Sequence, residues 1–140
     1  PLLLRALRDP VAEVRAAAAL ALGPHGDERA ERELLALVAE GPRDVAAAEV
    51  LGELGALSAA RAHRILAGYR ERLADPATSA AARSWLTQGL GELRGAFGDG
   101  APAGPSADPH GADPLRTLLA ELARDADRAV ARVASYLLAS

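Results

Sequence analysis

The sequence predicts an all-α fold, and three observations support that prediction. Alanine occurs 35 times and leucine 23 times in 140 residues, and both are strong helix formers. Residues that favour strands are sparse, and only four are aromatic: Tyr69, Trp85, Phe97 and Tyr136. A turn followed by a stretch rich in Val, Ala and Leu recurs every thirty-odd residues, a period typical of stacked helical hairpins. We therefore expect paired helices whose alanine faces approach each other closely.

The first pair of helices is expected at 2–8 and 10–22. Asp9 is a good N-cap for the second helix because its carboxylate accepts free amides of the first turn. Pro10 suits the first helical position, where no donor is required. Gly23-Pro24 ends the helix, and 25–27 form a turn. The apolar spacing predicts a core-facing stripe made of Val11, Val14, Ala18, Ala21 and Leu22.

The second and third pairs are expected at 28–40 with 44–54, and at 58–74 with 79–97. Gly41-Pro42 separates the first two of these helices, and Gly55 ends 44–54. Ser58 caps the helix that runs to 74, and Asp75-Pro76 turns the chain again. The residues of 58–74 at core spacing are Ile65, Leu66, Tyr69 and Leu73.

The last pair is expected at 114–124, capped by Asp113, and at 127–139. Before it, 98–113 is rich in Gly and Pro and has no apolar periodicity, so we expect a flexible insertion there. The chain then reads as one domain over 1–140 with helix pairs at 1–23, 28–55, 58–97 and 114–139. We expect it to be a fragment of a longer protein, because Pro1 begins inside a helical pattern.

Composition and charge exclude several classes of function. With no cysteine, the chain has no disulfides and no thiolate metal sites. No apolar run approaches the ~20 residues that cross a bilayer, so we expect no membrane partner and a cytoplasmic location. The net charge of −3 gives no general attraction to nucleic acid. The charge is uneven, since residues 58–97 carry six arginines against three acids.

The segment from Asp9-Pro10 through Val14-Arg15 to Leu22-Gly23 resembles a HEAT repeat, of the short bacterial type named after phycobilisome lyases. The resemblance is good again in the fourth helix pair at 114–139, partial in the second at 28–55 and weak in the third at 58–97. It implies a right-handed α-solenoid of about four antiparallel hairpins, whose second helices line a concave surface that binds a partner. It also implies that Arg15 is an ion-pair arginine between repeats. Known members are scaffolds, adaptors, chromophore lyases and a few DNA glycosylases, so the resemblance indicates a fold more than a function.

The second helices supply the candidate binding surface. On the side away from the predicted core they present a mixture of charge with isolated Leu and Tyr, which is typical of a partner-binding strip. We call these residues the predicted strip: Glu13, Leu20, Glu49, Glu53, Arg83, Thr87, Arg132 and Tyr136. A merely solvated face is the alternative.

Other candidate residues have structural interpretations. Trp85 is expected to fill the core beside small alanines, with stacking on a base or peptide as the alternative. The basic residues of 58–74 are expected to decorate an exposed helix, partly compensated by Glu71 and Asp75, rather than to bind an anion. That basic set comprises Arg61, His63, Arg64, Arg70 and Arg72. His25, His63 and His110 have no metal-ligand spacing, and no nucleophile with a paired base is evident, so we expect no metal, no cofactor and no catalytic residues.

Two functions remain open at this point. The first is a non-enzymatic scaffold or interaction module that binds a protein or peptide on the concave face. The alternative is a HEAT-fold nucleic-acid-binding protein or a DNA glycosylase-like enzyme, which requires a continuous basic concave surface. A homodimer through exposed terminal repeats is also left open.

Overall fold

The computed structural model describes residues 2–22, 28–41, 44–97 and 113–139, and these form α-helices, one 3₁₀ segment and no strand. The all-α class is therefore confirmed. Of the predicted loops, the turn at 25–27 lies outside the described residues, and so does the insertion at 98–113 except for Asp113. In chain order the elements are α1 (Leu2–Ala6), α2 (Ala12–Leu22), α3 (Glu28–Glu40), α4 (Asp44–Leu57), α5 (Ala59–Ala74), α6 (Ala80–Gly89), η2 (Leu90–Ala96), α7 (Pro114–Leu122) and α8 (Arg128–Ala139).

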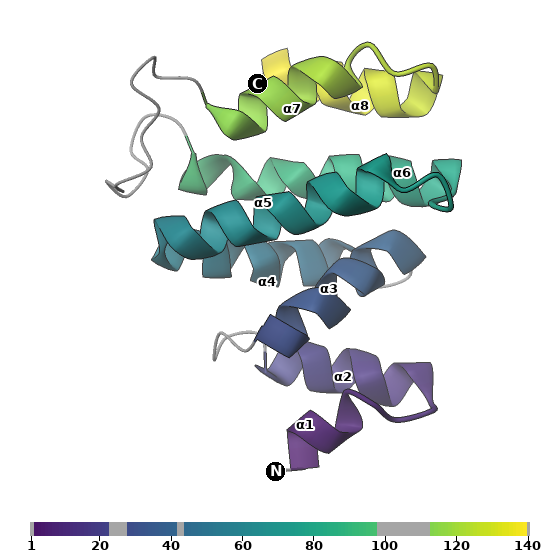
Figure 1. Ribbon diagram of the computed structural model, residues 1–140, viewed down its shortest axis with the longest axis vertical. Coiled ribbons are helices and arrows are strands. Elements are labelled where there is room, and N and C mark those ends of the chain that lie inside the picture. Colours follow the sequence, from purple (N-terminus) through teal and green to yellow (C-terminus); the bar gives the residue numbers. More distant parts are fainter. Residues whose placement is uncertain (1, 23–27, 42–43, 98–112, 140) are drawn as a thin grey trace.

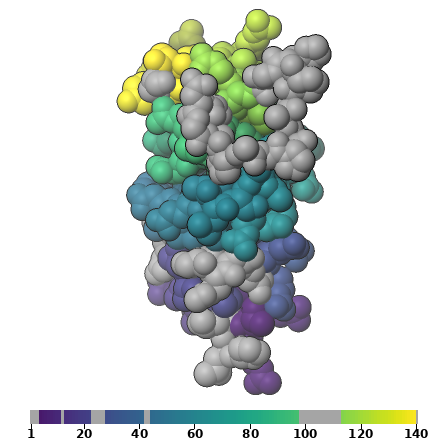
Figure 2. All heavy atoms as spheres, turned by 90° about the vertical axis from the view of Figure 1, so that its left-hand side faces the viewer, coloured from purple at the N-terminus to yellow at the C-terminus, as the bar shows by residue number. Residues whose placement is uncertain are grey.

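The helices follow one another along the long axis of the molecule. In Figure 1, α1 and α2 lie at one end, α7 and α8 at the other, and α3 to α6 in order between them. The even-numbered helices, which are the second helices of the predicted pairs, pack on one another in order: α2 contacts α4, α4 contacts α6, and α6 contacts α8. Turned by 90°, the molecule still runs from purple to yellow along its length (Figure 2). The molecule is an elongated stack.

Local capping explains where several helices begin. The Ser58 hydroxyl accepts a hydrogen bond from the Arg61 amide at 3.4 Å, and Ser79 accepts one from the Ala82 amide at 3.1 Å. Asp113 accepts from the amides of residues 115 and 116, and Asp127 from those of 129 and 130. Each cap satisfies amides that have no partner inside the helix. The predicted boundaries of α3 and α5 agree with the structure, within one residue for α5.

Two predicted helix ends are clearly wrong, and the packing of α4 against η2 bears on both. Gly55 does not end α4, which continues to Leu57, because Gly55 is buried where a Cβ would lie 3.2 Å from Leu93. The predicted helix 79–97 is α-helical only to Gly89 and then becomes the 3₁₀ segment η2. In η2 every third residue is buried (Leu90, Leu93 and Ala96), and a helix of three residues per turn places these on one face.

One continuous apolar core runs through the stack. Its largest fully buried side chains include Tyr69, Ile65 and Leu86, and the predicted core residues of 58–74 are all buried. Close-packed alanines bring the second helices near their neighbours, since Ala19, Ala47 and Ala134 are buried. These alanines let the helices meet at short range while leucines fill the space between the two layers.

The predicted inward stripe of α2 is largely wrong. Val11 and Val14 are 54% and 39% exposed, and Ala21 is also exposed, whereas Ala16 and Ala19 are buried. Of the other predicted stripe residues, Ala18 is buried and Leu22 half-buried. Alanines occupy every side of this helix, so its sequence has little amphipathic contrast, and the contacts with α1, α3 and α4 decide which side is buried.

Candidate partner-binding surface

Five of the eight residues of the predicted strip are exposed on the second helices. They are Glu13 on α2, Glu49 and Glu53 on α4, and Arg132 and Tyr136 on α8. Because α2, α4, α6 and α8 contact one another in order, their exposed sides follow each other along the stack. We call the surface formed by these five residues the second-helix face.

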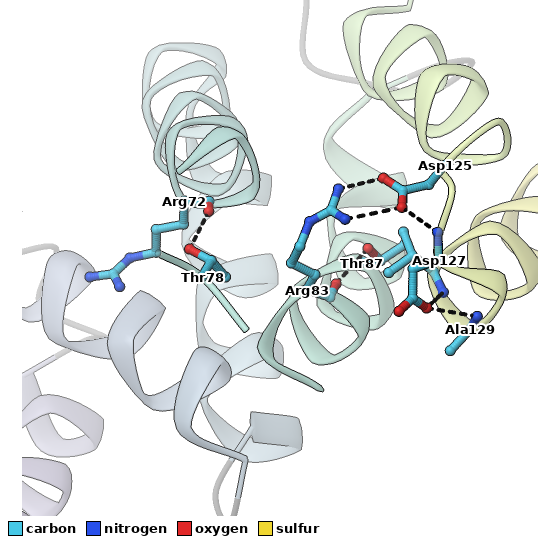
Figure 3. Close-up of polar contacts among 8 residues, drawn as sticks. Arg72, Thr78, Arg83, Thr87, Asp125, Asp127 and Ala129 are labelled. Carbon is cyan, nitrogen blue, oxygen red and sulfur yellow. Dashed lines mark hydrogen bonds and ion pairs between the residues drawn. The ribbon is translucent and has the colours of Figure 1, made fainter. Parts of the chain in front are cut away.

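Thr87 and Leu20 do not belong to an exposed strip. Thr87 is fully buried on the side of α6 that faces α8, and its hydroxyl donates a hydrogen bond to the Arg83 carbonyl at 2.7 Å (Figure 3). The prediction that it points away from the core is wrong because a threonine whose hydroxyl bonds within its own helix can pack between helices. Leu20 is half-buried and packs against the core cluster.

Arg83 of the predicted strip is engaged in a bidentate ion pair. Its Nη1 donates to Asp125 Oδ1 at 3.0 Å and its Nη2 to Asp125 Oδ2, and the side chains are 24% and 14% exposed (Figure 3). The hydrogen bond from Arg83 lowers the pKa of the Asp125 carboxyl, against the opposing effect of burial. Asp125 also accepts from the Asp127 amide at 2.9 Å. The pair therefore joins α6 to the turn before α8 and neutralises the charge of Arg83.

The arginine predicted to act between repeats is also half-buried. Arg15 lies 3.5 Å from Glu33 of α3 and donates to the Asp9 carbonyl at 2.7 Å. This arrangement agrees with a structural role for Arg15.

Two of the basic residues of α5 are paired with acids of other helices. Arg64 donates to both carboxylate oxygens of Glu31 on α3, at 2.8 and 2.7 Å, and Arg70 lies 3.7 Å from Glu121 on α7. The compensating acids therefore come from α3 and α7 rather than from Glu71 and Asp75, as the sequence predicted. Because these acids belong to neighbouring helices, helical spacing within 58–74 gave no sign of them.

A different group of carboxylates has no cationic partner among the residues that the structure describes. These acids are Glu13, Asp44, Glu49, Glu53 and Glu92, on α2, α4 and η2. Four of these five carboxylates lie on the second helices α2 and α4, the fifth lies beside them on η2, and Arg128 and Arg132 are exposed on α8. The second-helix face is acidic over α2 and α4 and basic over α8.

A cavity of about 170 Å³ lies beside this face, between α4 and the α6–η2 segment. Its apolar lining comes from Val45, Ala48, Trp85 and Gly89. Asp44, Gln88 and Glu92 add polar groups. The sequence missed this site because its lining residues lie on segments about forty residues apart in the chain.

Trp85 is only half-buried, so the prediction that it fills the core is wrong. Its ring packs over the turn between α3 and α4, where Gly41 has a φ of 104° and a Cβ would lie 2.7 to 2.9 Å from three ring atoms. A residue without a side chain is required there both for the backbone and for the indole.

The histidines of the chain do not take part in a metal-binding cluster within the described ranges. His63 is exposed, with Nδ1 2.9 Å from the Ala59 carbonyl and its ring 5.3 Å from that of Phe97. His25 and His110 lie outside these ranges. Groups of three or more His, Cys, Asp or Glu placed to hold a metal ion do not occur in the part of the chain that is described. None of the helices described has the length and apolar character needed to cross a membrane.

Comparison of the chain with protein-family models, with curated proteins and with solved structures gives no match.

Proposed function

We propose that this chain is a non-enzymatic interaction or scaffold module that binds a protein or peptide on its second-helix face. In this proposal the stack is an α-solenoid of four antiparallel HEAT-like hairpins with a right-handed superhelix, as the resemblance of 9–23 implies. The observation that carries the proposal is the exposure of Glu13, Glu49, Glu53, Arg132 and Tyr136 on helices whose opposite sides form the core.

The chemistry of the face supports a protein ligand more than a nucleic acid. Exposed carboxylates at Glu49 and Glu53 repel phosphates, and two of the four arginines of α5, Arg64 and Arg70, are paired with acids. An exposed aromatic side chain at Tyr136, which is 71% exposed, is typical of protein interfaces. The change of charge from α4 to α8 would fix the direction in which a partner lies.

The test is affinity capture with a charge-reversed face. A variant carrying Glu49→Arg and Glu53→Arg is compared with the wild type for the proteins retained from a lysate of cells that contain the chain. We expect the variant to retain the partners of the wild type about tenfold less. Glu49 and Glu53 lie one turn apart on α4, and a partner whose charge complements these carboxylates is repelled by two arginines.

Glu71→Arg is the matched control, because Glu71 is exposed on α5, outside the second-helix face. Equal retention by the double variant would count against the proposal. Micromolar binding of duplex DNA at physiological salt by the wild type would instead favour the nucleic-acid alternative.

A further inference from the structure

The cavity between α4 and the α6–η2 segment combines an aromatic wall with carboxylates from two helices. Trp85 is half-buried, and its ring packs closely against Gly41. The indole is therefore held in place before any ligand arrives. A fixed aromatic face beside solvent attracts cations and flat polar groups.

Asp44 and Glu92 supply negative charge at this wall. Asp44 comes from the first turn of α4 and Glu92 from η2, and neither makes an ion pair with a described residue. By contrast, Glu31 on α3 has an arginine of the chain itself as its partner. The carboxylate of Glu31, which joins α3 to α5, is thus neutralised by Arg64, whereas the carboxylates of Asp44 and Glu92 at the cavity have no charged partner among the described residues.

The dimensions of the cavity limit what it admits. A volume of about 170 Å³ equals that of a few water molecules, at about 30 Å³ each. This space suits one long side chain. Val45, 63% exposed at the same opening, offers apolar contact for the methylene part of such a side chain.

A wider depression of about 460 Å³ at the turn between α5 and α6 offers no comparable chemistry. Its one arginine, Arg83, is already paired with Asp125, and the Asp75 carboxylate accepts from the Ala77 amide.

We propose that the cavity binds an arginine side chain of the protein partner. The guanidinium stacks on the Trp85 indole, and its donors pair with the carboxylates of Asp44 and Glu92. Arginine fits better than lysine because its planar group stacks on an aromatic face and presents several donors in one plane. Glu49 and Glu53, exposed on the same helix as Asp44, extend the negative charge to basic neighbours of that arginine. This inference rests on the proposed function and specifies the chemistry of the partner.

Trp85 is the only tryptophan of the chain, so its fluorescence reports on this cavity alone. The probe is N-acetyl-arginine amide, titrated against the folded chain. We expect a saturable fluorescence change with a dissociation constant of about 1 mM, as a single side chain contributes only a few kcal/mol. The citrulline analogue has the same shape without the charge, and we expect no saturable change with it.

Two variants and a control locate the binding. Glu92→Gln and Asp44→Asn should each weaken binding of the arginine probe about tenfold. Glu71→Gln, an exposed carboxylate on α5, should leave it unchanged. Circular dichroism checks that each variant keeps its helices. An equal response to citrulline, or unchanged affinity in both cavity variants, overturns the inference.

A second arm separates this inference from the proposed function. Peptides are selected from a random displayed library on the wild-type chain and measured against the Glu49→Arg, Glu53→Arg variant and against Glu92→Gln. Selected peptides that contain arginine and weaken with both variants support both ideas. Peptides that weaken only with the α4 variant leave the proposed function standing and overturn the arginine site. Arginine-amide binding without any face-dependent peptide supports the site and opposes the proposed function.

Discussion

Arginines paired with acids join different helices of the stack. Arg15 reaches Glu33, Arg64 reaches Glu31, and Arg83 reaches Asp125, which is 42 residues away. A pair of this kind stabilises more than an exposed one because less water screens it, although its net contribution is reduced by desolvation. Since the apolar side chains are mostly interchangeable alanines and leucines, these directional pairs specify which helices meet.

Removing the charge of Asp125 should lower stability in a pH-dependent way. Asp125→Asn breaks the pair with Arg83, and we expect a loss of about 1 to 2 kcal/mol at pH 7. Because Arg83 lowers the folded-state pKa of Asp125, the stabilisation is complete above the unfolded value of about 3.9 and falls as the pH drops below it. Urea unfolding at several pH values should show wild type and variant converging below about pH 4. A difference that stays constant down to acidic pH would contradict this expectation.

The Tyr69 hydroxyl is buried and has no hydrogen-bond partner among the described groups. Burial raises the pKa of Tyr69, with the Glu92 charge adding to the effect. Tyr69→Phe removes an unsatisfied polar atom and keeps the ring, so we expect unchanged stability or a gain of up to about 1 kcal/mol. Urea unfolding measures the effect, and Tyr69→Ala, with an expected loss of about 3 to 5 kcal/mol, is the control for the ring. A clear loss in the phenylalanine variant would mean that the hydroxyl is bonded.

At the scale of single elements, glycines decide how closely helices approach. Gly52 of α4 faces η2, where a Cβ would lie 2.5 Å from the Glu92 carbonyl oxygen. At Gly95 of η2, no atom lies within 4 Å of the place that a Cβ would occupy. These two glycines therefore have different roles: one permits a contact and the other only adds backbone freedom.

Substituting these two glycines should change stability in opposite directions. Gly52→Ala forces α4 away from η2, and we expect a loss of about 1 to 3 kcal/mol. Gly95→Ala restricts the unfolded chain without a clash, and we expect a gain of about 0.4 to 1 kcal/mol. Thermal unfolding followed by circular dichroism checks both. Destabilisation of equal size in the two variants would refute the difference drawn between them.

The sequence predicted those features that depend on neighbouring residues. Ser58 and Asp113 cap helices as expected, because capping involves amides only two or three residues away. The exposed side of α2, the change from α6 to η2 and the burial of Thr87 were missed, since each depends on helices packed from elsewhere in the chain. The cavity beside Trp85 was missed for the same reason, since Gly41 and Asp44 precede α5 in the chain and Trp85 follows it.

At the scale of the whole molecule, the stack has a well-packed middle and less supported ends. α4 packs against α2, α3, α5, α6 and η2, whereas α1 packs mainly on α2. Elements that share more buried contacts open less often, because opening them exposes more apolar surface. The described chain thus has a gradient of local stability.

Hydrogen exchange should reveal this gradient. We expect the amides of α4 and α5 to be the most protected and those of α1 to exchange fastest, with α8 protected through its contact with α6. Exchange of native protein followed by mass spectrometry measures it. The Asp125→Asn variant should accelerate exchange in α8 and leave α3 unaffected, because the broken pair joins α6 to the turn before α8. Uniform protection from α1 to α8 would contradict the gradient.

Every sizeable contact between described elements joins segments at most three places apart in chain order, as with α3 and α6. During synthesis on a ribosome, each emerging helix therefore meets partners that have already left the exit tunnel. Asp125 emerges after Arg83, and their pairing secures the layer of α7 and α8 onto the layers made before it.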